Sequence, residues 1–429
     1  MPRPPELDRA LANPEGITEL RVRLTSETRD LADLVRLPRL RELTLYGELA
    51  GELPAVVSEL PALDSLALHD WDEPALPEAL RTMTGLRELT LVSASTLDEL
   101  PAWLGALPKL QRIEVVASAL TRMSIADGYA SLESLRLDRV PMVTLPAGLW
   151  ALPALTEIEL QLPAMTSFPG ELGKSRSLAR LDIHAPLVGL PEALGERAFG
   201  GLRELRIIGG TLPAVPGWVG EMNALESLSL FGDEIEMLSP QLAGLSALEV
   251  LDLGHNQLAT LPAWVGVLTR LRTLLVPMNR LTSLPDLSQL TRLERLDVST
   301  NPLRVLPASI GELSALETLH ASNCQLDAVH ERIAALPRLR HVRLARNRLR
   351  RLPAALLARV STSDVEHNPL PTDTLRRIVD YYQPEPCPRC GMKRVHLVES
   401  ATWDYGRDTE IHQVFQCEAC RHGWERDTW

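Results

Sequence analysis

The sequence lacks any long apolar run and any apolar leader. No stretch of about eighteen apolar residues occurs, which is the length that a membrane-spanning helix needs. The first residues, MPRPPELDRALANPEG, contain no hydrophobic core of the kind found in secretory signal peptides. We therefore expect neither a membrane-spanning segment nor export, and no membrane partner.

The sequence is also short of basic residues and of aromatic residues. Lys and Arg number 44 against 56 Asp and Glu, so the formal net charge is −12. Because a phosphate backbone attracts basic surfaces, this balance makes nucleic acid an unlikely partner and favours a basic or neutral protein patch. Aromatic residues make up 4% of the chain although hydrophobic residues make up 45%.

The aliphatic residues are arranged in a repeat, which residues 248–270 illustrate with LEVLDLGHNQLATLPAWVGVLTR. In an extended segment Leu251 and Leu253 point to one side and Asp252 points to the other. Asn256 follows where the chain turns away, and its amide can pair with backbone groups of that turn. The second apolar residue of each such segment recurs every 21 to 24 residues from Leu45 to Val365.

A single repeat cannot bury its own apolar edge, so successive repeats must stack into a solenoid. An earlier segment with Leu20, Val22 and Leu24 has the same pattern and is expected to begin the stack. The sequence therefore predicts an α/β solenoid with about sixteen strands in one parallel sheet.

These motifs, with LPASI at 306–310 and LPAAL at 352–356, resemble the leucine-rich-repeat superfamily, specifically its cytosolic class of 23-residue LPxxL repeats. The resemblance covers roughly residues 17–370 and implies a curved horseshoe whose concave parallel sheet binds other proteins. Asparagine fills the turn position in most later repeats, at Asn256, Asn279, Asn301, Asn347 and Asn368, but in none of the earlier ones. We therefore expect less regular convex turns in the first half.

Four segments follow from the pattern: an N-terminal cap with the first strand at 1–36, the solenoid at 37–370, a C-terminal capping helix at 371–383, and a small domain at 384–429. The caps are expected because an open stack leaves apolar side chains and strand edges uncovered.

Cysteine is scarce, with five residues that all lie at or beyond Cys324. Secreted proteins of the resembled family usually close the ends of the array with disulfides, and no such cluster stands here, so we expect a reducing, cytoplasmic compartment. Cys324 occupies the asparagine position of its repeat and is interpreted as an inward turn residue rather than a nucleophile.

The other four cysteines form two CxxC pairs, Cys387 with Cys390 and Cys417 with Cys420. Two intervening residues let a tight turn direct both thiolates at one tetrahedral zinc ion. The segment resembles a zinc ribbon, with 393–399 and 410–416 able to pair as a hairpin. Four thiolates leave no position for a reactive water, so the zinc is expected to be structural; a pair of disulfides is the alternative if the protein is exported.

We expect the partner on the concave face, toward the C-terminal half. The candidate residues combine an apolar centre with a charged rim, as protein interfaces do. They are Phe231, Val250, Asp252, Leu275, Met278, Asp297, His320, His341 and Arg343.

The sequence thus predicts a non-enzymatic scaffold or adaptor that binds a protein, with the ribbon as cap or second contact. One alternative is an effector similar to leucine-rich-repeat ubiquitin ligases, although 384–429 has no cysteine outside the quartet. Another is a nucleic-acid-binding ribbon, although that segment has six basic and eight acidic residues, a net charge of 6 − 8 = −2. Partner identity and oligomeric state are left open.

Overall fold

The computed structural model describes most of the repeat array and part of the C-terminal segment. The described residues are 2–28, 30–47, 53–125, 128–192, 194, 201–353, 356 and 365–371 and, for the backbone alone, 362–364 and three strands within 395–428.

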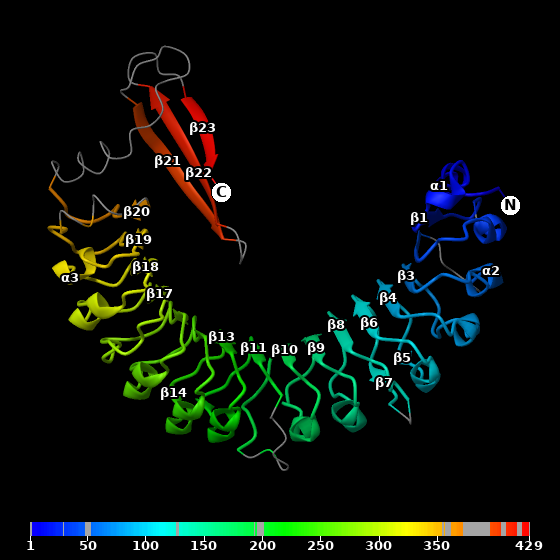
Figure 1. Cartoon of the computed structure of the whole chain (residues 1–429), viewed down its shortest axis with the longest axis horizontal. Helices are drawn as coiled ribbons and strands as arrows, with labels where there is room; N and C mark the ends of the chain where they lie inside the picture. Colours follow the sequence, from blue (N-terminus) through cyan, green and yellow to red (C-terminus); the bar gives the residue numbers. More distant parts are fainter. Residues whose placement is uncertain are drawn as a thin grey trace.

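One curved parallel sheet of sixteen strands runs through the array and lines the inside of an arc (Figure 1). Its strands, in spatial and chain order, are β1 (Glu19–Leu24), β2 (Glu42–Gly47), β3 (Ser65–His69), β4 (Glu88–Val92), β6 (Arg112–Val116), β8 (Ser134–Asp138), β9 (Glu157–Gln161), β10 (Arg180–His184), β11 (Glu204–Ile208), β13 (Ser227–Phe231), β15 (Val250–Asp252), β16 (Thr273–Leu275), β17 (Arg295–Asp297), β18 (Thr318–His320), β19 (His341–Arg343) and β20 (Thr362–Asp364). The predicted solenoid, its strand count and its register are confirmed.

Stacked leucines hold adjacent strands together. Leu228 on β13 pairs in register with Leu251 on β15, which pairs with Leu274 on β16, and all three are buried. Each buried leucine contributes roughly 1.5–3 kcal/mol by leaving water. Because the same positions recur in every coil, the core is one continuous column rather than a globular centre.

A bend with positive φ follows most strands. His255, Met278 and Thr300 have φ of 57, 53 and 56°, while Gly209 and Gly232 hold the same position in earlier coils at 84 and 76°. A left-handed conformation costs an L-residue roughly 1–2 kcal/mol. Hydrogen bonds to the next coil offset this cost, such as His255 N to Pro277 O at 2.8 Å and Met278 N to Ser299 O at 2.8 Å.

The asparagines after these bends pair with backbone groups of the turn, as predicted for Asn256, and form a ladder of amides along the array. Asn301 accepts a hydrogen bond from Leu281 N at 3.0 Å and donates to Val276 O and Val298 O at 2.9 Å. Cys324 takes the same place, is fully buried, and directs its Sγ to Val298 O at 3.2 Å. Its interpretation as an inward turn residue is confirmed.

The convex side consists mainly of five-residue 3-10 turns in both halves of the array. They are η3 (Glu78–Thr82), η4 (Ala102–Ala106), η5 (Ala147–Ala151), η6 (Gly170–Lys174), η7 (Gly217–Glu221), η8 (Pro240–Gly244), η9 (Ala263–Val267) and η10 (Ala308–Glu312), with the short helices α2 (Ala55–Ser58) and α3 (Glu331–Ala334) in equivalent places. The expectation of less regular convex turns in the first half is wrong for these segments. Proline before the turn and apolar side chains beneath it set this geometry, and asparagine is not required.

Short parallel pairs lie beside the convex turns. β5 (Glu99–Leu100) pairs with β7 (Arg122–Met123), and β12 (Ala214–Val215) pairs with β14 (Met237–Leu238).

The N-terminal end contains α1 (Pro5–Ala10), η1 (Pro14–Gly16) and η2 (Ala32–Arg36) around β1. Leu7 of α1 is fully buried and covers the apolar edge of the first coil. Leu34 of η2 is fully buried in the convex side of that coil, between β1 and β2.

The C-terminal segment contains an antiparallel sheet of β21 (Val395–Asp404), β22 (Thr409–Cys417) and β23 (Gly423–Thr428) (Figure 1). The predicted hairpin is present, since Val395 pairs with Cys417. Cys387, Cys390 and Cys420 and the Cys417 side chain lie outside the described residues, as does the predicted helix at 371–383 except for its first residue. The proposed domain boundaries therefore stay predictions. Within the described part, no helix is long and apolar enough to cross a membrane.

Candidate concave interaction surface

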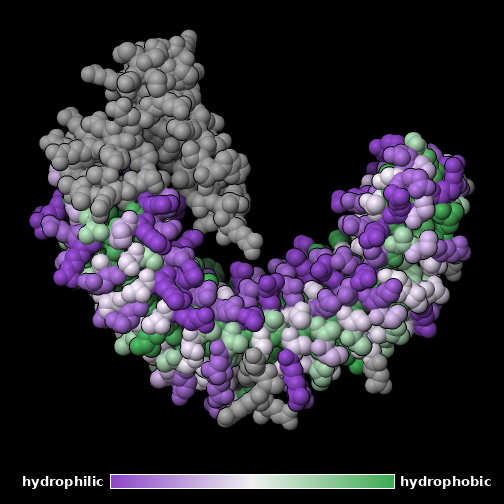
Figure 2. Space-filling view, in the orientation of Figure 1, coloured by the Kyte–Doolittle hydropathy of each residue, from purple (hydrophilic) through white to green (hydrophobic). Residues whose placement is uncertain are grey.

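Hydrophilic side chains line the inside of the arc, as Figure 2 shows. This follows from strand alternation: leucines point into the coil and the residues between them point to the concave side. The concave face is therefore where the chain presents ordered rows of charged and polar groups.

One row on β15 to β19 brings together five of the predicted partner-binding residues. Adjacent strands pair Asp252 with Leu275, Leu275 with Asp297, Asp297 with His320, and His320 with Arg343. We call these five residues the middle row. An apolar side chain thus lies between two carboxylates, with a histidine and an arginine beyond the second.

Asp297 is ionised at neutral pH. Burial alone would raise its pKa, but hydrogen bonds from His320 and Ser299 more than offset burial and hold the pKa below its usual value. His320 Nδ1 lies 3.4 Å from Asp297 Oδ2, and Ser299 N donates to Oδ1 at 2.9 Å. The carboxylate keeps 17% of its side-chain surface exposed.

Asp252 is a half-buried carboxyl whose pKa is raised. Burial is the main cause, and a hydrogen bond from Gly254 N at 3.0 Å together with the charge of Arg206 opposes it. Among the described residues no Lys or Arg forms a salt bridge with Asp252 or Asp297. Within the part of the chain that the structure describes, the charged group nearest Asp297 is therefore the His320 imidazole, and the positive charge that acts on Asp252 is that of the more distant Arg206.

Aromatic and apolar groups lie at the ends of the strands next to this row. Phe231 ends β13 with 36% of its surface exposed, and Met278 follows β16 with 49% exposed. The Phe231 ring centroid is 5.6 Å from that of His255. A methyl group on Gly254 would lie 3.0 Å from the Phe231 ring and 3.2 Å from Asp252 Oδ1. We call Phe231, Gly254, His255 and Met278 the edge cluster.

The sequence did not identify Gly254 or His255 as members of this surface. In the sequence, Gly254 and His255 stand directly before the ladder asparagine Asn256. Only the packing between coils shows that the Phe231 ring lies against Gly254. Phe231 and the Asp252 carboxylate therefore border the same backbone.

Val250 and His341 lie in a different row, at the starts of their strands. Val250 pairs with the hydroxyl residues Ser227 and Thr273 on the neighbouring strands. It therefore does not join Phe231 and Met278 in one apolar centre, as the sequence had suggested. Burial first, and then the charges of His320, Arg340 and Arg343, lower the pKa of His341. Its imidazole is therefore neutral at pH 7.

In the N-terminal half, the concave-facing residues at the equivalent strand position form ion pairs with one another. Arg136 lies 3.4 Å from Glu114, 3.5 Å from Glu159 and 3.9 Å from Asp138. Its charge is thus compensated within the protein, which distinguishes this region from the middle row.

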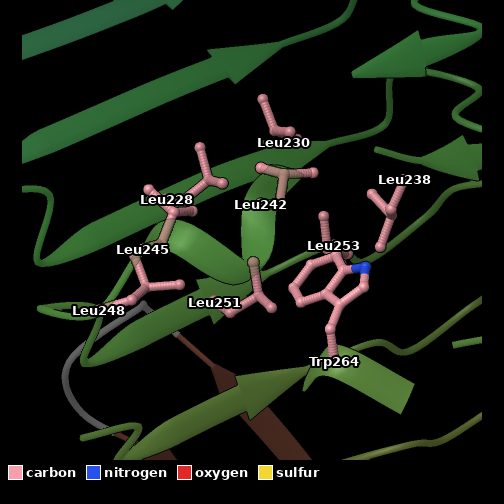
Figure 3. Close-up of a pocket in the computed structure, with 9 residues that line it drawn as sticks. All are labelled: Leu228, Leu230, Leu238, Leu242, Leu245, Leu248, Leu251, Leu253 and Trp264. Atoms are coloured by element: carbon pink, nitrogen blue, oxygen red, sulfur yellow. The ribbon is translucent and has the colours of Figure 1, made fainter. Parts of the chain in front are cut away.

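Cys324 and a small cavity both lie inside the core of the array. Burial raises the pKa of the Cys324 thiol to about 11, so the reactive thiolate is not present at neutral pH. A small cavity beside Trp264 is enclosed by leucines such as Leu242 and Leu251, inside the core of the coil (Figure 3). Among the described residues, no three His, Cys, Asp or Glu side chains gather as metal ligands would.

No protein-family model matches the chain. The human volume-regulated anion channel subunit LRRC8E is 27% identical over 260 residues, which cover 54% of this chain and 30% of that protein. The chain thus spans about a third of the length of the curated relatives it matches.

Solved structures resemble more of the chain. A leucine-rich-repeat protein of Leptospira interrogans superposes on this chain with a TM-score of 0.76 at 25% identity. The superposition covers 89% of this chain and 98% of the Leptospira protein. The complex of Toll with Spatzle from Drosophila gives a TM-score of 0.57 at 18% identity, covering 96% of this chain and 66% of that one. The continuous sixteen-stranded parallel sheet and these likenesses together show that the chain has a leucine-rich-repeat fold.

Proposed function

We propose that the chain is a non-enzymatic scaffold or adaptor that binds a protein partner on the concave face of β13 to β19. The observation that carries this proposal is the adjacency of the middle row and the edge cluster. Exposed Phe231 and Met278 lie beside the Asp252 and Asp297 carboxyls, which have no salt bridge to Lys or Arg among the described residues. Apolar anchors bordered by polar groups are the usual composition of a protein interface.

The fold supports this proposal. A curved sheet offers many side chains to a partner without any rearrangement, because each coil is held by its neighbours. Toll, which has the same fold, was solved in complex with Spatzle.

The test is a double charge substitution, Phe231→Glu with Met278→Glu. The partner captured from native cell extract by the full-length chain should bind at least about tenfold more weakly, because a carboxylate cannot enter an apolar contact. The melting temperature should fall only slightly, since both side chains are already exposed.

The matched control is Val267→Glu with Val305→Glu, two side chains that are 60% and 62% exposed outside the concave face. This control should retain the partner. Equal capture by both double variants would exclude β13 to β16 as the binding surface.

For the C-terminal segment we propose a structural zinc ion held by Cys387, Cys390, Cys417 and Cys420, in a protein of the cytoplasm. The support is the spacing of the two CxxC pairs, together with the antiparallel β21 and β22 between them. Thiolates in this arrangement bind zinc tetrahedrally and leave it no open position for catalysis. Elemental analysis of protein purified without chelator tests the metal.

A further inference from the structure

The distance between the two carboxyls of the middle row indicates which kind of partner fits there. Asp252 and Asp297 lie on strands that are separated by one further strand, β16. Neighbouring strands are about 4.8 Å apart, so the two carboxyls lie about 10 Å apart along the solenoid. Leu275 occupies the place between them.

The cations nearest in register cannot supply the missing charge. Arg272, immediately before β16, is paired with Glu249 at 3.4 Å and with Glu294. Arg295 begins β17, two residues before Asp297, and is not among the groups that shift the pKa of that carboxyl. The next arginines at the same strand position are Arg343, which ends the middle row on β19, and Arg206 on β11, beyond its other end. Each lies two strands from the nearer carboxyl. Strands β15 to β17 carry two carboxyls, Asp252 and Asp297, and one arginine, Arg295, so their formal net charge is negative.

The edge cluster adds an apolar and aromatic contact directly beside the first carboxyl. Phe231 and Asp252 Oδ1 both border Gly254, so one side chain of a ligand can reach the ring and the carboxyl together. Such a pair suits Arg or Lys, whose stem packs on apolar surface while the charged head meets the ring and the carboxylate.

We propose that the segment that binds here is a basic amphipathic stretch of a partner protein. Two of its cationic side chains, about 10 Å apart, would reach Asp252 and Asp297, with an aliphatic side chain between them over Leu275 and against Met278. This rests on the proposed function and specifies its partner. An α-helix places residues i and i+7 on one face about 10.5 Å apart, with i+3 or i+4 between, and so matches this spacing.

Charge also determines what is disfavoured. An acidic segment or a nucleic-acid phosphate would face two half-buried carboxyls, where repulsion is less screened than at a fully exposed site. Acidic partner residues would instead meet Arg343 at the far end of the middle row, which gives the bound segment a direction along the solenoid.

The test is selection of a displayed random-peptide library on the full-length chain, followed by affinity measurements on enriched synthetic peptides. We expect enriched peptides to be rich in Lys or Arg with aliphatic residues between. Binding should weaken about tenfold or more in Asp252→Asn with Asp297→Asn, and also in high salt. Glu236→Gln with Asp327→Asn, which removes two exposed carboxylates outside the concave face, should change affinity less than about twofold.

The outcomes separate the two proposals. Enrichment of acidic or neutral peptides, failure to enrich any, or undiminished affinity in the Asp252 and Asp297 double variant would overturn the basic-segment proposal. If peptides still lose affinity with Phe231→Glu and Met278→Glu, the concave binding surface stands although the partner chemistry is wrong. If neither double variant affects binding of the enriched peptides, both proposals fail.

Discussion

Asp233 occupies the turn position at which most later coils have asparagine. Because a carboxyl can gain or lose a proton and an amide cannot, this turn can titrate. Its Oδ1 accepts from Gly210 N at 2.8 Å, while Oδ2 is buried without a hydrogen-bond partner. Asn256, one coil later, accepts from Asp233 N and Ile235 N and donates to Leu230 O. The carboxyl can accept as an asparagine does, but it donates only when it is protonated.

We predict that Asp233 makes folding stability fall as pH rises. Burial raises its pKa from 3.8 to about 7, so between these values the folded chain keeps a proton that the unfolded chain has released. Stability should decline by roughly 1.4 kcal/mol per pH unit through this window and level off above it. In Asp233→Asn this decline should be absent, and stability at pH 8 should be higher than in the parent chain.

Denaturant unfolding from pH 4 to pH 8 measures the difference between the two chains. Asp327→Asn, at an exposed turn position, serves as a control that should follow the parent curve. Parallel pH profiles for Asp233→Asn and the parent would show that the Asp233 carboxyl is ionised throughout this range.

At the scale of elements, the convex turns are packed backbone against backbone. Gly220 in η7 approaches η8 so closely that a Cβ there would lie 2.0 Å from Gln241 O. Gly170, at the start of η6, would place a Cβ in open space. The two glycines are both in the convex turns but have different structural roles.

We therefore expect Gly220→Ala to destabilise the chain by about 2 kcal/mol or more, because a backbone oxygen cannot move without separating two coils. Gly170→Ala should be neutral or slightly stabilising, since it restricts the unfolded chain without a clash. Thermal unfolding of the two variants compares them directly. Similar melting temperatures would mean that η7 and η8 are not packed as closely as described.

At the scale of the whole molecule, stability is distributed along the coils rather than held in one centre. Each coil contacts its two neighbours, so damage to an end should not spread through the core. The C-terminal sheet β21 to β23 is separate from the sixteen-stranded sheet and shares no strand with it.

Cys390→Ser should therefore release the zinc proposed for the C-terminal segment while the repeat array keeps its melting transition. Zinc content and thermal unfolding measured on the same preparation test this. A cooperative loss of the whole fold in Cys390→Ser would mean that the two parts stabilise each other. Unchanged zinc content would remove Cys390 from the ligand set.

The candidate surface could be predicted only in part. The middle row was predictable because strand alternation and a constant period put Asp252, Leu275 and Asp297 on neighbouring strands. In the edge cluster, Phe231 and Met278 were predictable, but Gly254 and His255 were not, since the position of the Phe231 ring depends on the absence of a side chain at Gly254 in the next coil. Val250 was placed with the apolar residues by composition, although its neighbours in the sheet are hydroxyl side chains.

The sequence by itself determined the solenoid, the number of its strands and their register. Leucines at near-constant intervals can be buried only against equivalent leucines of adjacent coils, and this requirement is periodic and local. The tertiary structure alone decided the regular convex turns of the first half, the buried state of Asp233 and the absence of a salt bridge to Asp252 among the described residues. These features depend on distances between coils, which side-chain volume and backbone bends set jointly, and which no single repeat encodes.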